Sequence, residues 1–526
     1  MRGGLIVAAM IACSAPAMAQ RSGDAAAVAE QSIDTLQKLL RQGWTSERLT
    51  RAYLQRIESI DRRGPTLRSV IAISPDAVAQ ARASDARRRA GRALGPLDGV
   101  PVLIKDNIET RELPTTAGSL ALKDNRTGRD APLVARLRAA GAVILGKTNL
   151  SEWANIRSTA SMSGWSAVGG LVRNPYALDR TACGSSSGSG VAMAASLAAV
   201  AIGTETDGSV VCPSAMSGIV GLKPTLGLVS RTHVVPISHS QDTPGPMGRS
   251  VLDVAMLLSA IVGSDPADPA TTQADAQRRD FAAGLDPQAL RGKRVGYWRP
   301  EMRAELRAAF DAALEKLRAA GATPVEVKLP DLDGMGDAEF LVLKTELKAD
   351  LDAYLATTPA SVTTRTLASV IAFNEANRGV EMPFFGQETF LAAAATKGLD
   401  DPEYKAAREK SLRMARDALD GMMKTAGAEV LVTITYGTPW LSDSAHGDQF
   451  TGPSASELPA ISGYPHLTVP MGLVDGLPVG LSFIGPAWSD GQLLSAGYAY
   501  EQVAKARVAP SYAPRIPADL GPRKLN

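Results

Sequence analysis

Residues 183–209 read CGSSSGSGVAMAASLAAVAIGTETDGS. The stretch begins as a glycine- and serine-rich loop, continues as an alanine-rich helix expected over residues 190–197, and returns as an apolar strand expected over residues 199–203. Apolar runs at residues 100–104 and 142–145 are further strand candidates that alternate with helices. This alternation predicts an α/β fold, with a mixed sheet covered by helices on both faces.

The rest of the chain continues the pattern without an internal repeat or a low-complexity linker. Strands are expected over residues 69–74, 294–298, 323–327, 430–434, 467–469 and 480–484. Residues 341–423 are mostly helical by pattern. We therefore expect one large catalytic domain over residues 20–526, with a mainly helical insertion around residues 341–423.

Composition narrows the class of partner. Of the 526 residues, 45% are hydrophobic and 21% are charged, and 56 basic side chains balance 54 acidic ones. Such an even balance gives no electrostatic reason to expect nucleic acid or an anionic membrane surface. After the N-terminus no segment is apolar for long enough to cross a membrane. The expected partner is a small molecule or a peptide.

The first nineteen residues have the features of an export signal. Arg2 supplies the positive charge, residues 5–12 the apolar segment, and Ala-Met-Ala at residues 17–19 a cleavage motif. We expect cleavage after Ala19 and an exported protein, periplasmic or secreted. The alternatives are lipoprotein processing at Cys13, or a frayed hydrophobic helix at the N-terminus.

No metal or other cofactor is expected. The sequence has no Cys-x-x-Cys motif, and its histidines do not occur at metal-ligand spacings. The four histidines are His233, His239, His446 and His466.

Three segments carry candidate chemistry. Residues 99–107 place Lys105 at the end of an apolar strand, residues 183–190 form the glycine/serine loop, and residues 203–209 form a glycine-bounded turn that ends at Ser209. Each alone has an ordinary explanation, such as a strand-end lysine, a helix cap or a tight connection.

Other enzyme classes fit these segments less well. A phosphate-binding P-loop requires a lysine where Val191 stands. Residues 184–188 match the G-x-S-x-G pattern of α/β-hydrolases with Ser186 as nucleophile, but residues 174–180 are not the strand that this motif requires. A β-lactamase-like site lacks its Ser-x-x-Lys motif.

Taken together, the three segments resemble the amidase-signature family. The family's G-G-S-S-G-G-S motif matches residues 183–189, and its G-T-D-x-G-G-S motif matches residues 203–209. The resemblance implies the amidase-signature fold and a Ser–Ser–Lys triad. In that triad Ser209 is the nucleophile, Ser185 relays a proton from a cis peptide, and Lys105 is the base. The separation of Ser185 from Ser209 matches the family and favours this register over one with Ser186.

Departures from the family motifs resemble one branch of the family, which removes C-terminal amides from peptides. They are Cys183, Ser187, Glu205, Asp207 and Val211. The likeness extends through residues 221–225, 240–246, 381–387 and 480–485, and so covers nearly all of the expected mature chain.

Physical chemistry is consistent with these roles. Lys105 follows three apolar residues, and burial there would favour the neutral amine that a base requires. Successive backbone N–H groups of Thr206, Asp207, Gly208 and Ser209 could hold the oxyanion of a tetrahedral intermediate.

Further residues are candidates by position. Ser186, Phe384, Phe385 and Tyr436 are candidate substrate-binding residues, although aromatic side chains more often pack in a core. If Ser185 and Ser209 touch, their neighbours Cys183 and Cys212 lie close enough for a disulfide, the alternative being two buried free thiols.

The resulting hypothesis is a serine hydrolase that cleaves peptide C-terminal amides to acid and ammonia, acting as a monomer or homodimer. An amidase or esterase for aryl or fatty acyl substrates would use the same chemistry. A glutamyl-tRNA amidotransferase-like subunit requires cytoplasmic partners, which the export signal disfavours. A binding protein on a decayed enzyme fold is disfavoured because Lys105, Ser185 and Ser209 are all present.

Overall fold

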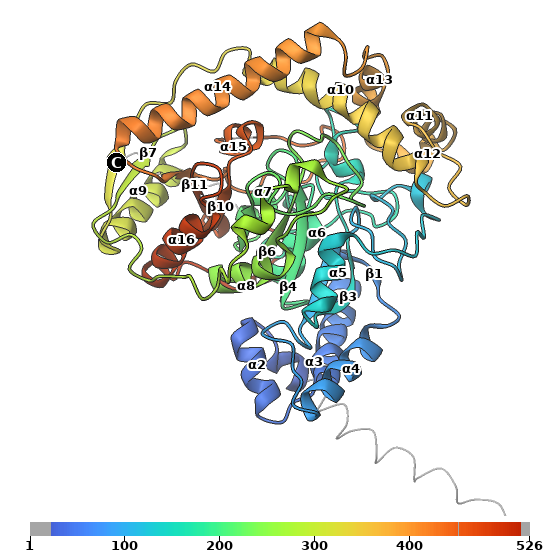
Figure 1. Cartoon of the computed structure of the whole chain (residues 1–526), viewed down its shortest axis with the longest axis vertical. Helices are drawn as coiled ribbons and strands as arrows, with labels where there is room; N and C mark the ends of the chain where they lie inside the picture. Colours follow the sequence, from blue (N-terminus) through green and yellow to red (C-terminus); the bar gives the residue numbers. More distant parts are fainter. Residues whose placement is uncertain (1–22, 451, 517–526) are drawn as a thin grey trace, which may run out of the picture.

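The computed structural model describes residues 23–450 and 452–516, so the predicted export signal lies outside the described residues. Within them, eleven strands form one mixed sheet (Figure 1). In order across the sheet the strands are β1 (Val70–Ile73), β3 (Val143–Thr148), β2 (Pro101–Lys105), β4 (Val200–Glu205), β6 (Thr243–Gly248), β5 (Val220–Lys223), β10 (His466–Val474), β11 (Leu477–Ile484), β9 (Leu431–Ile434), β7 (Arg294–Tyr297) and β8 (Thr323–Glu326).

The parallel strands of the sheet determine where the candidate residues meet. β2 runs parallel to both of its neighbours, β3 and β4. Every residue of β2 and β4 is buried, as expected for parallel strands covered on both faces. Because the two strands run in the same direction, their last residues, Lys105 and Glu205, lie at the same edge of the sheet.

Helices cover the sheet on both faces, which confirms the predicted α/β architecture. α8, α9 and α16 form one layer, in which α16 contacts both of the others, while α6 and α7 pack against each other and against the centre of the sheet. α6, with the sequence Ser-Gly-Ser-Gly-Val-Ala-Met-Ala, is buried on every side, which suits its lack of charged side chains. The helices up to α9 are α2 (Ile33–Arg41), α3 (Ser46–Arg56), α4 (Ala77–Arg89), α5 (Pro132–Ala139), α6 (Ser187–Ala194), α7 (Val211–Met216), α8 (Val251–Ile261) and α9 (Ala304–Ala319).

The segment expected to be mostly helical contains five helices. The two longest, α10 and α14, pack against each other and arch over the rest of the molecule, in yellow and orange at the top of Figure 1. The helices of this segment and those that follow it are α10 (Met335–Ala356), α11 (Leu367–Ala376), α12 (Arg378–Glu381), α13 (Glu388–Ala394), α14 (Pro402–Ala426), α15 (Glu457–Ser462) and α16 (Asp490–Ala504).

Some elements lie outside the sequence-based expectations. β6 has the sequence Thr-Pro-Gly-Pro-Met-Gly, which carries no strand signal, yet it pairs with β4 and β5. The neighbouring strand β5 and the C-terminal helix α16 were also not predicted. The proline and glycine residues of β6 are tolerated because its position in the sheet is determined by the strands on both sides.

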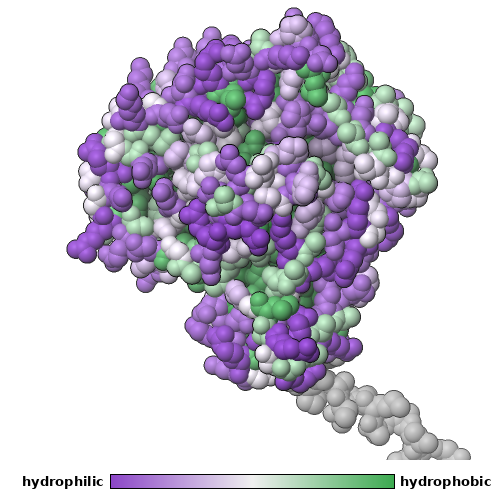
Figure 2. Space-filling view, viewed as in Figure 1, coloured by the Kyte–Doolittle hydropathy of each residue, from purple (hydrophilic) through white to green (hydrophobic). Residues whose placement is uncertain are grey.

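The surface in Figure 2 is mostly hydrophilic, with small hydrophobic spots scattered between charged side chains. None of the described helices combines the length and the apolar character needed to cross a membrane.

Candidate active site

Lys105 ends β2 with its side chain fully buried. Its Nζ atom lies 2.7 Å from Ser185 Oγ, 2.8 Å from Thr204 Oγ1 and 3.2 Å from the carbonyl oxygen of Thr204. Asn107 Nδ2 donates to the same Thr204 hydroxyl at 2.9 Å. Three oxygens from two other segments therefore surround the amine.

The loop before α6 presents Ser185 to this amine. The peptide bond between Gly184 and Ser185 is cis, as the family resemblance implies. A Cβ atom at Gly184 would lie 2.1 Å from Ser151 Oγ, so a larger residue there would displace this hydroxyl from its hydrogen bond with the Gly164 N–H. The Ser187 hydroxyl donates to the carbonyl of Cys183 and closes the loop.

Ser209 lies beside this loop, in the turn that follows β4. The backbone N–H of Ser186 donates to the carbonyl of Ser209 at 3.1 Å, which brings the two serine segments together. Ser209 lines a cavity of about 170 Å³, as do Gly184, Ile237, Leu343, Tyr436 and Phe450.

The turn is held by side chains while its central N–H groups stay available. Glu205 accepts hydrogen bonds from the N–H groups of Val210 and Val211, at the start of α7, at 2.7 and 2.9 Å. Thr206 donates its hydroxyl to Asp242 at 2.6 Å. In the described part of the chain, the N–H groups of residues 207–209 donate to no protein acceptor. Three donors next to the Ser209 hydroxyl are thus free for a ligand oxygen.

Burial of Lys105 lowers the pKa of its amine, the candidate base. Removal from water lowers the pKa of Lys105 to about 7, although the negative charges of Asp242 and Glu205 oppose the shift. Burial also raises the pKa of Asp242 to about 6, against the hydrogen bonds from Thr206 and from the N–H groups of Ile237 and Ser238. An amine with a pKa near 7 is neutral in a useful fraction of molecules at neutral pH.

Cys183 and Cys212 form a disulfide, with Cα atoms 6.0 Å apart. The sequence left open whether these residues are bonded or free. The bond joins the residue before Gly184 to the first turn of α7, three residues after Ser209. It therefore connects the two loops that carry Ser185 and Ser209.

Of the predicted substrate-binding residues, one lines the cavity of Ser209 and three do not. Tyr436 lines the cavity of Ser209. Ser186 is fully buried, and its hydroxyl donates to the carbonyl of Thr204 at 3.0 Å. Phe384 and Phe385 do not line this cavity; their rings pack edge-on against Trp165, with centroids 5.6 and 5.3 Å away.

Several cavity residues were not found from the sequence. Ile237 and Leu343 are ordinary apolar residues in distant segments, and no motif marks them. Phe450 is 62% exposed and packs against Trp440 with ring centroids 4.5 Å apart and ring planes tilted by 47°. An exposed aromatic side chain at the cavity suits contact with an apolar ligand group.

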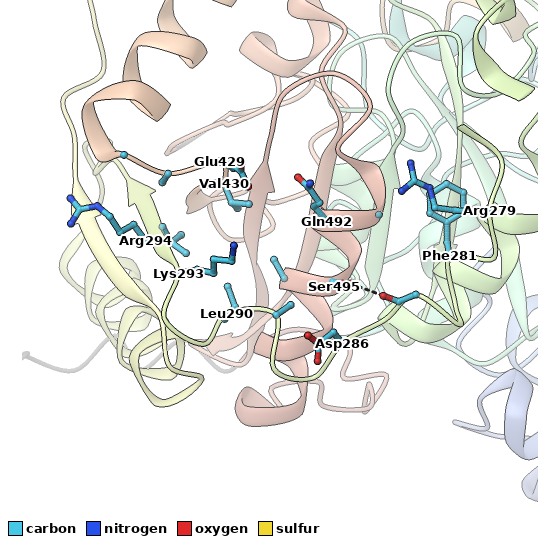
Figure 3. A pocket seen from close by; sticks show the side chains of 17 residues that line it. Arg279, Phe281, Asp286, Leu290, Lys293, Arg294, Glu429, Val430, Gln492 and Ser495 are labelled. Atoms are coloured by element: carbon cyan, nitrogen blue, oxygen red, sulfur yellow. Dashed lines mark hydrogen bonds between the residues drawn. The ribbon is translucent and has the colours of Figure 1, made fainter. Parts of the chain in front are cut away.

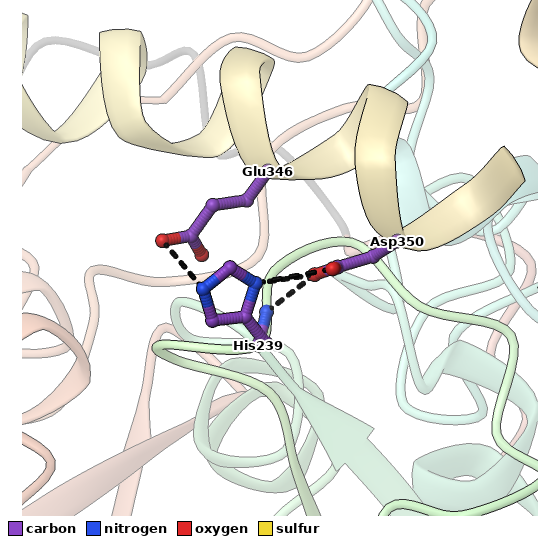
Figure 4. Close-up of side chains that lie close together, drawn as sticks. All are labelled: His239, Glu346 and Asp350. Carbon is purple, nitrogen blue, oxygen red and sulfur yellow. Dashed lines mark hydrogen bonds and ion pairs between the residues drawn. The ribbon is translucent and has the colours of Figure 1, made fainter. Parts of the chain in front are cut away.

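One group among the described residues has ligand atoms close enough to hold a metal ion, namely His239, Glu346 and Asp350 (Figure 4). His239 Nδ1 lies 2.9 Å from an Asp350 oxygen, and Nε2 lies 3.4 Å from Glu346 Oε1. Glu346 also accepts hydrogen bonds from Ser240 and Tyr404. Because these donors already use the carboxylate, the group serves to attach the loop at residue 239 to α10.

A larger cavity, of about 570 Å³, lies where α16 approaches the segments that precede β7 and β9 (Figure 3). Its lining mixes basic and acidic side chains, among them Lys293, Arg294, Asp286 and Glu429. None of the candidate site residues lines it. The chemistry therefore points to the smaller cavity at Ser209.

Comparison with known proteins points the same way. A sequence model of the family described as Amidase matches residues 48–494. The native peptide amidase from Stenotrophomonas maltophilia superposes with a TM-score of 0.87, at 50% identity over 92% of this chain and 99% of that one. A probable amidase from Arabidopsis thaliana is 39% identical and covers 89% of this chain and 88% of its own length. A glutamyl-tRNA(Gln) amidotransferase subunit from Synechococcus sp. is 35% identical, with 87% and 89% covered.

The disulfide should stabilise both the fold and the site. Cross-linking residues 29 positions apart restricts the unfolded chain, so replacing both Cys183 and Cys212 by serine should lower the free energy of unfolding by about 3 kcal/mol. Denaturant unfolding of the native and the doubly substituted chains measures this difference. Thiol labelling of both cysteines in unfolded, unreduced protein would contradict the bond itself.

Proposed function

The chain belongs to the amidase family, and we propose that it hydrolyses the C-terminal amide of peptides, releasing ammonia through an acyl-enzyme on Ser209. That it hydrolyses amides follows from the family and from its similarity to a peptide amidase. The observation that carries the proposal is the cavity at Ser209, which adjoins the buried Lys105–Ser185 contact.

In the proposed mechanism Lys105 begins as a neutral amine, with two N–H groups and one lone pair. The carbonyl and hydroxyl oxygens of Thr204 can accept its two N–H groups, which leaves the lone pair for the hydroxyl of Ser185. As Ser209 Oγ attacks the substrate carbonyl, its proton passes to Ser185, and the Ser185 proton passes to Lys105.

Attack converts the substrate carbonyl oxygen into an oxyanion. The free N–H groups of Asp207, Gly208 and Ser209 are the proposed donors to it, and each such donor typically contributes about 3 kcal/mol to the transition state. Gly208 has φ +77°, and a Cβ atom there would lie 2.3 Å from the Tyr436 hydroxyl. Glycine therefore lets the turn take this conformation beside the cavity wall.

The intermediate then collapses with loss of ammonia. Lys105 returns its proton through Ser185 to the leaving nitrogen, which departs as NH₃ and leaves an ester on Ser209. Water attacks this ester by the same proton path in reverse, giving the free acid and regenerating the Ser209 hydroxyl. Each half-reaction returns Lys105 and Ser185 to their starting protonation states, and the second restores the Ser209 hydroxyl, so no external acid or base is consumed.

Two features support a peptide substrate. The similar structure from Stenotrophomonas maltophilia is that of a peptide amidase, at 50% identity. The cavity is small and largely apolar, with Phe450 exposed at its wall, which suits the side chain of a C-terminal residue. Aryl and fatty amides are the alternative substrates, and a substrate screen separates them.

We also propose that the protein is exported. The support is the signal-like pattern of the first nineteen residues and the Cys183–Cys212 bond, since disulfides persist in oxidising compartments.

The mature chain should therefore begin at Gln20 when it is recovered from the periplasm or the medium. Intact-mass measurement of the fractionated protein tests this. A cytoplasmic protein that retains residues 1–19 would overturn export, and a lipid-modified Cys13 would replace the cleavage site.

Replacing Ser209 by alanine should reduce ammonia release from an N-acetylated peptide amide by about 10³-fold or more, because the proposed mechanism forms the acyl-enzyme on its hydroxyl. Ser214→Ala is the matched control, since Ser214 is buried on α7 and its hydroxyl has no hydrogen-bond partner among the described residues. Intact mass should detect an acyl adduct on the control but not on Ser209→Ala. Full activity of the Ser209 variant would refute the mechanism.

The pH profile should report Lys105. Because only the neutral amine accepts a proton, kcat/KM for an uncharged substrate should rise with pH and level off above about 7. Asp242→Asn removes a negative charge that raises the pKa of Lys105, so it should move the midpoint to lower pH. A shift to higher pH, or a profile with no group titrating near 7, would contradict the assignment of Lys105 as the base.

A further inference from the structure

Asp207 is the single charged residue among the described residues that line the cavity of Ser209. The other lining residues are apolar or neutral, and they include Asn155, Ser163 and Tyr436. Asp207 stands two positions before Ser209, in the turn whose N–H groups face the reacting carbonyl. A lone carboxylate so close to the nucleophile is a strong determinant of which substrates fit.

The carboxylate of Asp207 lacks a complete set of partners. Its Oδ1 atom is buried without a hydrogen-bond donor, and no Lys or Arg of the described residues forms an ion pair with Asp207. Burial raises the pKa of Asp207, while the nearby Ser456 hydroxyl and the charge of Lys223 oppose that shift. A buried acceptor without a donor is unfavourable, so a ligand that brings a donor gains binding energy there.

A second carboxyl group lies on the same side. Glu339 of α10 is 7% exposed, and burial raises its pKa well above the usual range, with the charge of Asp207 adding to the shift. Leu343, one helical turn further along α10, lines the cavity. The same face of α10 therefore contributes both an apolar wall and an acidic neighbour.

The order of the atoms along a peptide amide shows which donor would reach Asp207. Ser209 attacks the carbonyl carbon, and the carbonyl oxygen turns toward the N–H groups of residues 207–209. The next atom is Cα, and the α-nitrogen is bonded directly to it. That nitrogen carries an N–H in a peptide amide and an ammonium in an amino acid amide, whereas a fatty or aryl amide has no donor there.

We propose that Asp207 accepts a hydrogen bond from the α-nitrogen of the residue whose amide is cleaved, and so selects α-amino acid and peptide amides over aryl and fatty amides. The inference rests on the proposed function, because it assumes attack by Ser209. It assigns Asp207 a side-chain role in addition to its backbone N–H.

Four amides that share one phenyl ring test this assignment. N-acetylphenylalaninamide has an N–H at its α-nitrogen, and the analogue methylated on that α-nitrogen lacks it. The third amide, 3-phenylpropanamide, has no α-nitrogen, and the fourth, phenylalaninamide, carries an ammonium group there. The native enzyme should favour the first over the second and third by about 100-fold in kcat/KM. Asp207→Ala should remove most of that preference, because it should lower kcat/KM on the first amide far more than on the second and third.

Two more variants complete the design. Asp207→Asn keeps the size of the side chain and removes its charge, so it remains informative if the alanine variant fails to fold. It should weaken hydrolysis of phenylalaninamide more than that of N-acetylphenylalaninamide, since only the former offers a full positive charge. Glu457→Gln is the matched control, because Glu457 lies near Asp207 but does not line the cavity. It should preserve the preference for N-acetylphenylalaninamide.

The outcomes separate this inference from the proposed function. An equal loss on all four amides in Asp207→Ala would mean that Asp207 only shapes the turn, and it would overturn the inference while Ser209 keeps its role. A native preference for 3-phenylpropanamide would overturn both the inference and the peptide substrate. Undiminished ammonia release by Ser209→Ala would instead overturn the proposed mechanism.

Discussion

The site depends on one amine enclosed in the interior of the protein. Lys105 Nζ is removed from water, and its nearest partners are Ser185 Oγ at 2.7 Å and two oxygens of Thr204. A buried charge is costly, so burial favours the neutral amine, and the oxygens around it satisfy its hydrogen-bonding groups. Base strength and position thus have one cause, the location of Lys105 at the end of a fully buried parallel strand.

Three chain segments approach one another closely at the site because glycines stand at the points of contact. The Lys105 strand, the Ser185 loop and the β4 turn can meet only where side chains leave room. A Cβ atom at Gly203 would lie 2.7 Å from Ser186 Oγ, and one at Gly184 would lie 2.1 Å from Ser151 Oγ. The Cys183–Cys212 bond then connects the two serine segments covalently. Glycines permit the contact, and the disulfide with its surrounding hydrogen bonds maintains it.

Local signals in the sequence mark only part of the fold and of the site. The strands ending near Lys105 and Gly203 were predicted because apolar runs lie between turn residues, and the Ser185 register came from motif spacing. β6 could not be predicted, because two prolines and two glycines obscure a strand that exists through pairing with β4 and β5. Tyr436 was predicted as a cavity residue, but Leu343 and Phe450 were missed, since they reach the cavity through tertiary packing of distant segments.

Two buried acids oppose the neutral form of Lys105. Ionised Glu205 and Asp242 would both favour a protonated Lys105. Their charges are partly balanced by donors from the protein: N–H groups at the start of α7 for Glu205, and for Asp242 the Thr206 hydroxyl with two N–H groups. Asp207 differs in position: its Oδ1 atom, like Oε1 of Glu205, lacks a donor, but Asp207 lines the cavity of Ser209 and Glu205 does not. The unpartnered oxygen of Asp207 therefore lies beside the nucleophile, where an incoming substrate can supply the donor.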